Sequence, residues 1–228
     1  MYLQKKIQVC FSPALLSFFD VDNNTVILII DVLRATTSIC TAFQNNVKEI
    51  IPVATLEEAK EYKLKGFIVA AERDGIKADF ADFGNSPFNF MNDDIKDQTL
   101  VYSTTNGTQV INLVKNVTSD IVIGSFINLT AVCNFLLNKN KDVLIICAGW
   151  KGKFNLEDTI CAGAVAQNLI NSSKFQTNCD STIAAIDLWN LAKNNLINYI
   201  EKCAHRHRLK KFNLDDIIPY AFTIDLTN

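Results

Sequence analysis

The sequence predicts an α/β fold, a three-layer α/β/α arrangement in which helices cover both faces of a mostly parallel central sheet. Short apolar, β-branched runs alternate with longer helical patterns along the chain, as in sheets built from βαβ units. Several runs are apolar on both faces, which is typical of parallel strands covered by helices on each side. With 228 residues, 49% of them hydrophobic, the chain is long enough to bury a substantial core.

The individual elements follow from these patterns. Strands are predicted over 6–11, 26–31, 49–53, 67–71, 99–103, 121–124 and 143–147. Helices are predicted over 35–44, 56–64, 109–114, 131–138, 156–169 and 182–203. The chain shows no repeat and no convincing linker, so we expect a single domain over residues 1–228. The longest irregular segment, 76–97, is long enough to cover a functional site.

Composition and charge argue against several classes of protein. The formal net charge of −2 gives no global basic field, so neither nucleic acid nor a membrane surface is an expected partner. The seven cysteines are odd in number and form no C-x-x-C pair, which disfavours a disulfide framework or zinc ribbon and indicates a cytoplasmic protein. No signal peptide or membrane span is evident, because the strongest apolar run, 26–30, stops at Asp31. Formation of a homo-oligomer stays open.

Charged residues follow two of the predicted strands, at the edge where ligands collect in open α/β sheets. Asp31 and Arg34 follow the apolar run 26–30. A carboxylate at the end of so apolar a strand is costly unless it is paired or coordinated, which favours a functional role for Asp31 over helix capping. Glu72 follows the strand 67–71 in the same way. The competing interpretation for Glu72 is a surface ion pair with the adjacent Arg73.

Two turns after predicted strands are candidate anion sites. The first is a hydroxyl-rich turn at a helix start, which can direct backbone N–H groups at phosphate and comprises Thr104, Thr105, Asn106, Gly107 and Thr108. An ordinary capped turn has a similar composition, so this cluster alone is not specific. In the second turn, Gly149 and Gly152 permit close approach of a ligand, while Lys151 and Lys153 supply positive charge.

Two further groups have competing interpretations. Asp158 lies in the first turn of a helix capped by Asn155, where an acidic residue favours the helix dipole, but it could instead reach a metal or orient a water molecule. The basic segment 205–211 is interpreted, for most of its members, as a solvated helix end whose cations oppose the dipole.

The motif Ile-Ile-Asp-Val-Leu-Arg-Ala-Thr-Thr at 29–37 is followed, in order, by distinctive motifs at 70–75, 83–87, 104–108, 124–126, 147–152 and 156–164. Together they resemble the 2-phosphosulfolactate phosphatase family over most of the chain. The resemblance implies a three-layer α/β fold, Mg²⁺ dependence, and hydrolysis of 2-phospho-3-sulfolactate to 3-sulfolactate and phosphate, a step associated with coenzyme M synthesis. The chain departs from the family pattern at Asp74, where Gly is usual, and this adds a negative charge beside the expected site.

Residue chemistry and resemblance lead to the same expected mechanism. The candidate catalytic residues are the phosphate clamp Arg34 and three carboxylates that would bind Mg²⁺ or orient water, namely Asp31, Glu72 and Asp158. Phosphate would bind at the turn 104–108, with further charge from Lys151 and Lys153. The carboxylate and sulfonate of the substrate require additional cations, for which the candidates are Arg73, His205 and Arg208.

Three alternatives stay open at this stage. Asp31 could act as a nucleophile, as in haloacid-dehalogenase-type phosphatases, but Leu33 stands where their second aspartate is needed, so attack by water is preferred. A phosphatase for another small 2-phospho acid is also compatible with these residues. A noncatalytic binder of phosphorylated metabolites would use the same turns and cations, although clustered carboxylates would repel an anion unless a metal were bound.

Overall fold

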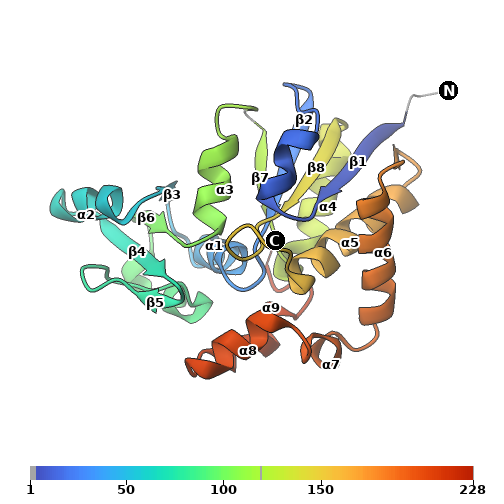
Figure 1. Ribbon diagram of the computed structural model, residues 1–228. Helices are drawn as coiled ribbons and strands as arrows, with labels where there is room; N and C mark the ends of the chain where they lie inside the picture. The colour runs from blue at the N-terminus through green and yellow to red at the C-terminus, as the bar shows by residue number, and fades with distance from the viewer. Residues whose placement is uncertain (1–3, 119, 228) are drawn as a thin grey trace.

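The computed structural model describes residues 4–118 and 120–227, whose strands form two sheets (Figure 1). The first sheet is parallel and has the order β7 (Ile121–Gly124), β2 (Thr25–Ile30), β8 (Asp142–Cys147), β1 (Lys5–Cys10) and β9 (Phe175–Gln176). The second has the order β3 (Glu49–Pro52), β6 (Thr99–Ser103), β4 (Ile68–Arg73) and β5 (Ile76–Lys77), with β5 antiparallel to β4. The α/β class and the parallel pairing are therefore confirmed.

Helices cover both faces of the parallel sheet. One face packs against α4 (Leu129–Lys139), α5 (Leu156–Asn171) and α6 (Asp180–Ala192). The opposite face packs against α3 (Gly107–Val114) and the 3₁₀ helix η1 (Pro13–Phe18). Every residue of β2 is buried, as the uninterrupted apolar run 26–30 predicts for a central parallel strand. This part of the molecule has the expected three layers.

The mixed sheet lies beside the parallel one, and two helices join them (Figure 1). Its one face packs against α2 (Leu56–Leu64), and the other against α1 (Ala35–Gln44) and the 3₁₀ helices η2 (Pro87–Phe90) and η3 (Asp93–Ile95). Helix α1 contacts β7, while α3 contacts β2 as well as β3 and β6. The expected single central sheet is thus divided, because β7 and β8 occupy both edges of β2 and leave no place there for the strands that follow α1.

The C-terminal part of the chain crosses the end of the parallel sheet at which β2 stops. It consists of α7 (Leu196–Ile200), α8 (Ala204–Lys211), η5 (Asp215–Ile217) and α9 (Ile218–Ala221), which lie together below the sheets in Figure 1. Another short helix, η4 (Phe126–Asn128), leads from β7 into α4. No helix of the described chain is both long and apolar enough to cross a membrane.

The predicted elements agree with the structure except near the C-terminus. All seven predicted strands are present with ends within two residues, while the two-residue strands β5 and β9 were not predicted. The single helix predicted over 182–203 is wrong: α6 ends at Ala192, and the Asn195 side chain then caps α7 by accepting a hydrogen bond from the Asn198 N–H. The segment 76–97 contains β5, η2 and η3. The single-domain assignment stays a prediction.

Candidate active site

A cavity of about 280 Å³ lies where the ends of β2 and β4 approach α8. Its wall brings together segments that are far apart in the sequence: Asp31, Leu33, Arg34, Glu72, Asp74, Gly75, Asn85, Asn106, Trp150, Lys151, His205, Arg208, Leu209, Lys211 and Phe212. The structure therefore gathers seven of the predicted site residues around one space, namely Asp31, Arg34, Glu72, Asn106, Lys151, His205 and Arg208.

Asp31 is held at the cavity by the turn that joins β2 to α1. The Asp31 N–H donates to Thr36 Oγ1 at 2.9 Å, and the Thr36 N–H donates to the Asp31 carbonyl at 3.0 Å. Burial raises the pKa of the Asp31 carboxyl from its usual 3.8 to about 6; His205 opposes this shift, and the negative charge of Glu72 adds to it. Asp31 is only 4% exposed, yet it is ionised at neutral pH.

Arg34 stands three residues further on, at the start of α1. The peptide bond between Leu33 and Arg34 is cis, and the Arg34 side chain is 5% exposed. Its Nη2 donates to the Gly75 carbonyl at 3.3 Å. Burial lowers the pKa of the guanidinium, while the charge of Glu72 opposes that change; an arginine nevertheless stays protonated. A permanent cation thus lies in the field of the two carboxylates.

Glu72 joins the end of β4 to the turn that precedes α3. Its Oε1 accepts a hydrogen bond from the Thr105 N–H at 2.8 Å, and its Oε2 accepts from Thr105 Oγ1 at 3.1 Å and from the Gly75 N–H at 2.7 Å. These bonds hold the Glu72 carboxylate at the cavity wall. Arg73 points elsewhere, since it donates to the carbonyls of Glu72 and Ala54 and to Ser103 Oγ. The structure does not bring Arg73 to the cavity.

The hydroxyl-rich turn uses much of its hydrogen-bonding capacity internally. The Thr104 N–H donates to Thr108 Oγ1 at 2.9 Å, and the Thr108 N–H donates to Thr104 Oγ1 at 3.1 Å. Thr105 is bonded to Glu72, as described above, and Asn106 Oδ1 accepts from the Lys151 N–H at 3.0 Å. Gly107 packs so closely that an added Cβ would lie 3.0 Å from Asp31 Oδ2. Asn106 is the member of the predicted phosphate cradle that lines the cavity.

Asp158 lies behind the cavity wall. Its Oδ1 accepts a hydrogen bond from the Val32 N–H at 2.8 Å, and its Oδ2 accepts from the Gly149 N–H at 3.0 Å. Burial raises the pKa of Asp158, with the charges of Glu157 and Asp31 acting in the same direction and the two N–H donors opposing them. Asp158 is not a lining residue, and its two oxygens tie the turn after β2 to the turn after β8; its role as a metal ligand stays a prediction.

The turn after β8 brings one of its two lysines to the cavity. Reciprocal backbone hydrogen bonds of 3.0 Å between Trp150 and Lys153 close this turn. Gly149 has φ +63°, and an added Cβ there would lie 2.1 Å from the Lys153 carbonyl oxygen, so the turn requires glycine. Lys151 lines the cavity and pairs with Asp74 at 2.6 Å, whereas Lys153 is exposed and outside the lining.

Helix α8 supplies a wall that the sequence interpretation largely missed. His205, Arg208, Leu209 and Phe212 follow the spacing i, i+3, i+4, i+7, which defines one helix face, and all four line the cavity. The other basic members His207 and Lys210 are exposed, as predicted. This spacing within the basic segment was the signal that could have separated the cavity face from the solvated face.

His205 and Trp150 connect α8 to the strand ends. His205 Nδ1 lies 2.9 Å from Glu157 Oε1, and both side chains are buried. The Trp150 ring centroid lies 5.5 Å from that of the His205 ring and 4.5 Å from Cζ of the Arg208 guanidinium. Leu33, Asn85 and Trp150 are further lining residues that were not predicted individually.

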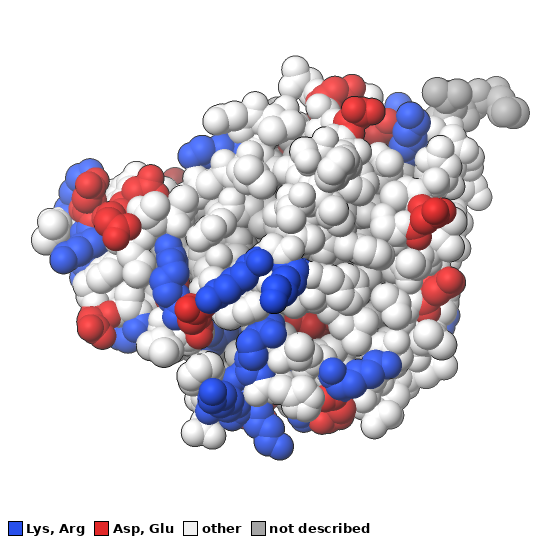
Figure 2. Space-filling model, viewed as in Figure 1, with Lys and Arg blue, Asp and Glu red and all other residues white. Residues whose placement is uncertain are grey.

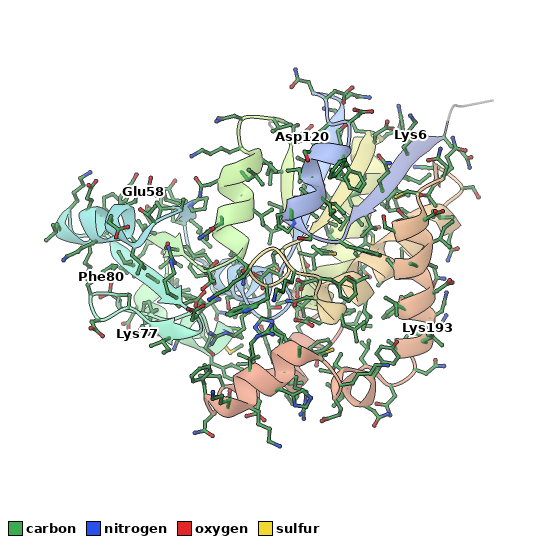
Figure 3. All side chains as sticks on the ribbon, viewed as in Figure 1. Lys6, Glu58, Lys77, Phe80, Asp120 and Lys193 are labelled. Atoms are coloured by element: carbon green, nitrogen blue, oxygen red, sulfur yellow. The ribbon has the colours of Figure 1, made fainter. Side chains whose placement is uncertain are left out.

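Positive charge is concentrated around this cavity although the whole chain is slightly acidic. Figure 2 shows Lys and Arg side chains gathered over α8 and over the loop that follows β8. The ion pairs of Asp120 with Lys139 and Lys141 lie elsewhere, at the opposite end of the parallel strands. Asp120 immediately precedes β7 and is labelled in Figure 3. The basic character of this chain is therefore local to one face.

The carboxylates at the cavity fit one kind of metal site. Across residues 4–118 and 120–227, no three His, Cys, Asp or Glu side chains form a metal-binding cluster. Asp31 and Glu72 nevertheless line the same cavity. Mg²⁺ commonly uses one or two carboxylates together with water and substrate phosphate, so this pair is compatible with Mg²⁺ bound alongside an anionic substrate.

Parallel strands that end in buried carboxylates, beside a wall rich in cations, define an α/β enzyme for a small anionic substrate. The 2-phosphosulpholactate phosphatase family model matches residues 10–228. The chain belongs to this family of phosphoric monoester hydrolases, which confirms the resemblance seen in its motifs.

Individual relatives extend the match over most of the chain. A protein of Caldanaerobacter subterraneus subsp. tengcongensis is 34% identical over 203 residues, covering 87% of this chain and 83% of the relative. One from Thermotoga maritima is 37% identical over 199 residues, covering 87% and 85%. One from Clostridium novyi is 32% identical over 226 residues, covering 98% and 94%. Each of the three is named a probable 2-phosphosulfolactate phosphatase.

Proposed function

We propose that this chain hydrolyses 2-phospho-3-sulfolactate to 3-sulfolactate and inorganic phosphate, with Mg²⁺ as its cofactor. The observation that carries the proposal is the placement of Arg34 beside the carboxylates Asp31 and Glu72 in one cavity, in a chain that belongs to the 2-phosphosulpholactate phosphatase family. A phosphate monoester reacts extremely slowly without a catalyst, so its site must neutralise the phosphoryl oxygens and orient water in line with the bond that breaks.

The chain's own residues account for much of this task. Arg34 would bind two phosphoryl oxygens through its planar fork, and its burial strengthens that interaction by excluding water. Asp31 would orient the attacking water and accept its proton, since its pKa of about 6 leaves it ionised at neutral pH. Asp31 and Glu72 would also hold Mg²⁺, which when bound neutralises the charge that develops on the phosphoryl group.

Other residues would hold these groups in position. Asp158 fixes the turn that carries Asp31 relative to the turn that carries Trp150, because its two oxygens bind backbone N–H groups of both. Helix α8 closes the opposite wall and limits the access of bulk water to the cavity.

Phosphate release from 2-phospho-3-sulfolactate tests the proposal directly. The purified protein should release phosphate with Mg²⁺ and lose this activity with EDTA. Full turnover in EDTA would show that the metal assignment is wrong. If kcat/KM were higher for 2-phospholactate or 2-phosphoglycerate than for 2-phospho-3-sulfolactate, that acid would be the preferred substrate instead. Binding of these acids without any phosphate release would indicate a receptor instead.

A further inference from the structure

The Arg208 side chain on α8 is a cation at the cavity wall that forms no ion pair within the described part of the chain. Its Nε and Nη2 atoms are buried and form no hydrogen bond with the described part of the chain. It also forms no ion pair with any described carboxylate, whereas Lys151 on the same wall is paired with Asp74. Burial lowers the pKa of Arg208, which reflects the cost of removing this charge from water. A buried guanidinium in this situation is stabilised when an anion binds it.

The Arg208 guanidinium contacts an aromatic ring at the cavity wall. Its Cζ lies 4.5 Å from the centroid of the Trp150 ring, within the range of a cation–π contact. Trp150 belongs to the turn that is closed by its reciprocal backbone bonds with Lys153. This contact restrains the guanidinium, and a planar fork so held loses less freedom on binding an oxyanion than a lysine would.

Arg208 and Arg34 belong to different parts of the cavity. Arg34 and Glu72 both form hydrogen bonds with the backbone of Gly75, whereas Arg208 contacts Trp150 in the turn after β8. The two arginines also come from separate elements, the turn after β2 and helix α8. If phosphate occupies the end of the cavity with Arg34 and the carboxylate pair, Arg208 remains for a second acidic group of the same ligand.

We propose that Arg208 binds the sulfonate of the substrate and thereby determines substrate specificity; this inference rests on the function proposed above. In 2-phospho-3-sulfolactate the carboxylate is attached directly to the carbon that bears the phosphate, while the sulfonate is one carbon further away. The sulfonate is therefore the group suited to Arg208, which lies at Trp150 and not at the Gly75 turn that Arg34 and Glu72 share. A sulfonate carries a permanent charge and three oxygens, two of which fit a guanidinium fork. Lys211 lines the same wall and adds positive charge.

Kinetics with two substrates that differ in the sulfonate test this role. Arg208→Gln should raise KM for 2-phospho-3-sulfolactate by about tenfold or more, because a charge-assisted bidentate contact is lost. KM for 2-phospholactate, which keeps the phosphate and carboxylate but lacks the sulfonate, should stay within about twofold of the parent value. Arg208→Lys should raise KM for 2-phospho-3-sulfolactate by a smaller factor, again without raising KM for 2-phospholactate. Lys210→Gln removes an exposed cation from the same helix and should leave KM for both substrates unchanged.

Calorimetric measurement of 3-sulfolactate binding, with lactate as the reference ligand, tests the same role without requiring phosphate hydrolysis. Arg208→Gln should weaken 3-sulfolactate binding by about tenfold and leave lactate binding unchanged. Equal losses for both ligands, or for both substrates, would show that Arg208 contacts a shared group and would overturn the proposal. Unchanged 3-sulfolactate affinity would overturn it as well.

The two proposals can fail separately. If the parent protein does not hydrolyse 2-phospho-3-sulfolactate, the proposed function is wrong, while the calorimetric comparison still decides whether Arg208 recognises a sulfonate. If Arg208→Gln fails to fold, as judged by circular dichroism, Arg208→Lys decides the question, because it keeps the buried charge and removes the planar fork. The proposal is supported if Arg208→Lys binds 3-sulfolactate more weakly than the parent does and binds lactate equally well. It is contradicted if the ratio of the two affinities is the same as in the parent.

Discussion

Asp158 Oδ1 accepts a hydrogen bond from the Val32 N–H at 2.8 Å, so the first turn of α5 is tied to the residue that follows Asp31. The second oxygen of the same carboxylate binds the Gly149 N–H at 3.0 Å. One buried side chain thus sets the relative position of the turns after β2 and β8. This arrangement supports a positioning role for Asp158, in place of the direct metal ligation expected from the sequence.

Asp158→Asn should separate these two roles. An amide oxygen can accept one of the two backbone hydrogen bonds, but the amide nitrogen cannot accept the other, so the two turns are no longer held together. We expect kcat to fall about tenfold or more, because small displacements of catalytic groups are costly, with no change in the Mg²⁺ concentration that gives half-maximal rate. A Mg²⁺ titration of the initial rate measures both quantities.

Asp180→Asn is the matched control, since it makes the same change in the first turn of α6, where the side chain is exposed. Its kinetics should equal those of the parent. A large increase in the Mg²⁺ requirement of Asp158→Asn would restore Asp158 as a metal ligand.

Asp31 should make the protein less stable as the pH rises. Burial raises its folded-state pKa from 3.8 to about 6, so folding favours the protonated form. The stability that this group contributes below about pH 4 is lost as the pH rises through about 6. In EDTA, Asp31→Asn should therefore be more stable than the parent above pH 6, by up to about 3 kcal/mol, and this advantage should vanish near pH 4.

Urea unfolding of parent and Asp31→Asn at several pH values measures this difference. An advantage of equal size at low and neutral pH would contradict the assignment of the raised pKa to Asp31. The same variant should have little phosphatase activity, which would make Asp31 a residue that costs stability in return for function.

The sequence predicted the strands well but not the way in which they pair. The run 26–30 is apolar throughout, which is sufficient to identify a buried strand at β2. Its neighbours β7 and β8 lie far along the chain, and no local pattern states which strands will flank it. The division into two sheets depends on that choice, because β3, β4 and β6 then pair with one another around α1 and α3.

The sequence identified residues that line the cavity where local sequence determines their position, and it missed others where packing determines it. Asp31 was identified because a carboxylate at the end of an apolar strand is costly to bury unless it is paired or coordinated. Arg208 was considered as an extra cation, but its segment has the composition of a solvated helix end. Its contact with Trp150 joins residues 58 positions apart and exists only once α8 packs across the sheet. The hydroxyls at Thr104 and Thr108 bind within their own turn, which composition alone could not distinguish from a phosphate cradle.

Gly107→Ala should disturb the cavity through a single added methyl group. The new Cβ would lie 2.5 Å from the Ala35 Cβ and 3.0 Å from Asp31 Oδ2, so α3 must move away from the start of α1. We expect a loss of about 1–3 kcal/mol in the free energy of unfolding, together with a lower kcat. Gly84→Ala is the control, because its added Cβ would meet its nearest atom at an ordinary 3.5 Å. Parent-like urea unfolding and kinetics for Gly107→Ala would show that the close packing around Asp31 is not needed.

Arg34→Lys should distinguish a phosphate clamp from a general source of positive charge. Lysine keeps the charge beside Asp31 and Glu72 but cannot offer two parallel N–H donors to the phosphoryl oxygens. We expect kcat/KM for 2-phospho-3-sulfolactate to fall about tenfold to a hundredfold, with an unchanged Mg²⁺ requirement, since the carboxylates are intact. Arg206→Lys is the matched control: it lies on α8 outside the cavity lining and pairs with Glu201 at 2.5 Å. Near-parent turnover by Arg34→Lys would mean that charge alone is sufficient at this position. A raised Mg²⁺ requirement would instead mean that Arg34 acts mainly by holding the carboxylates in place.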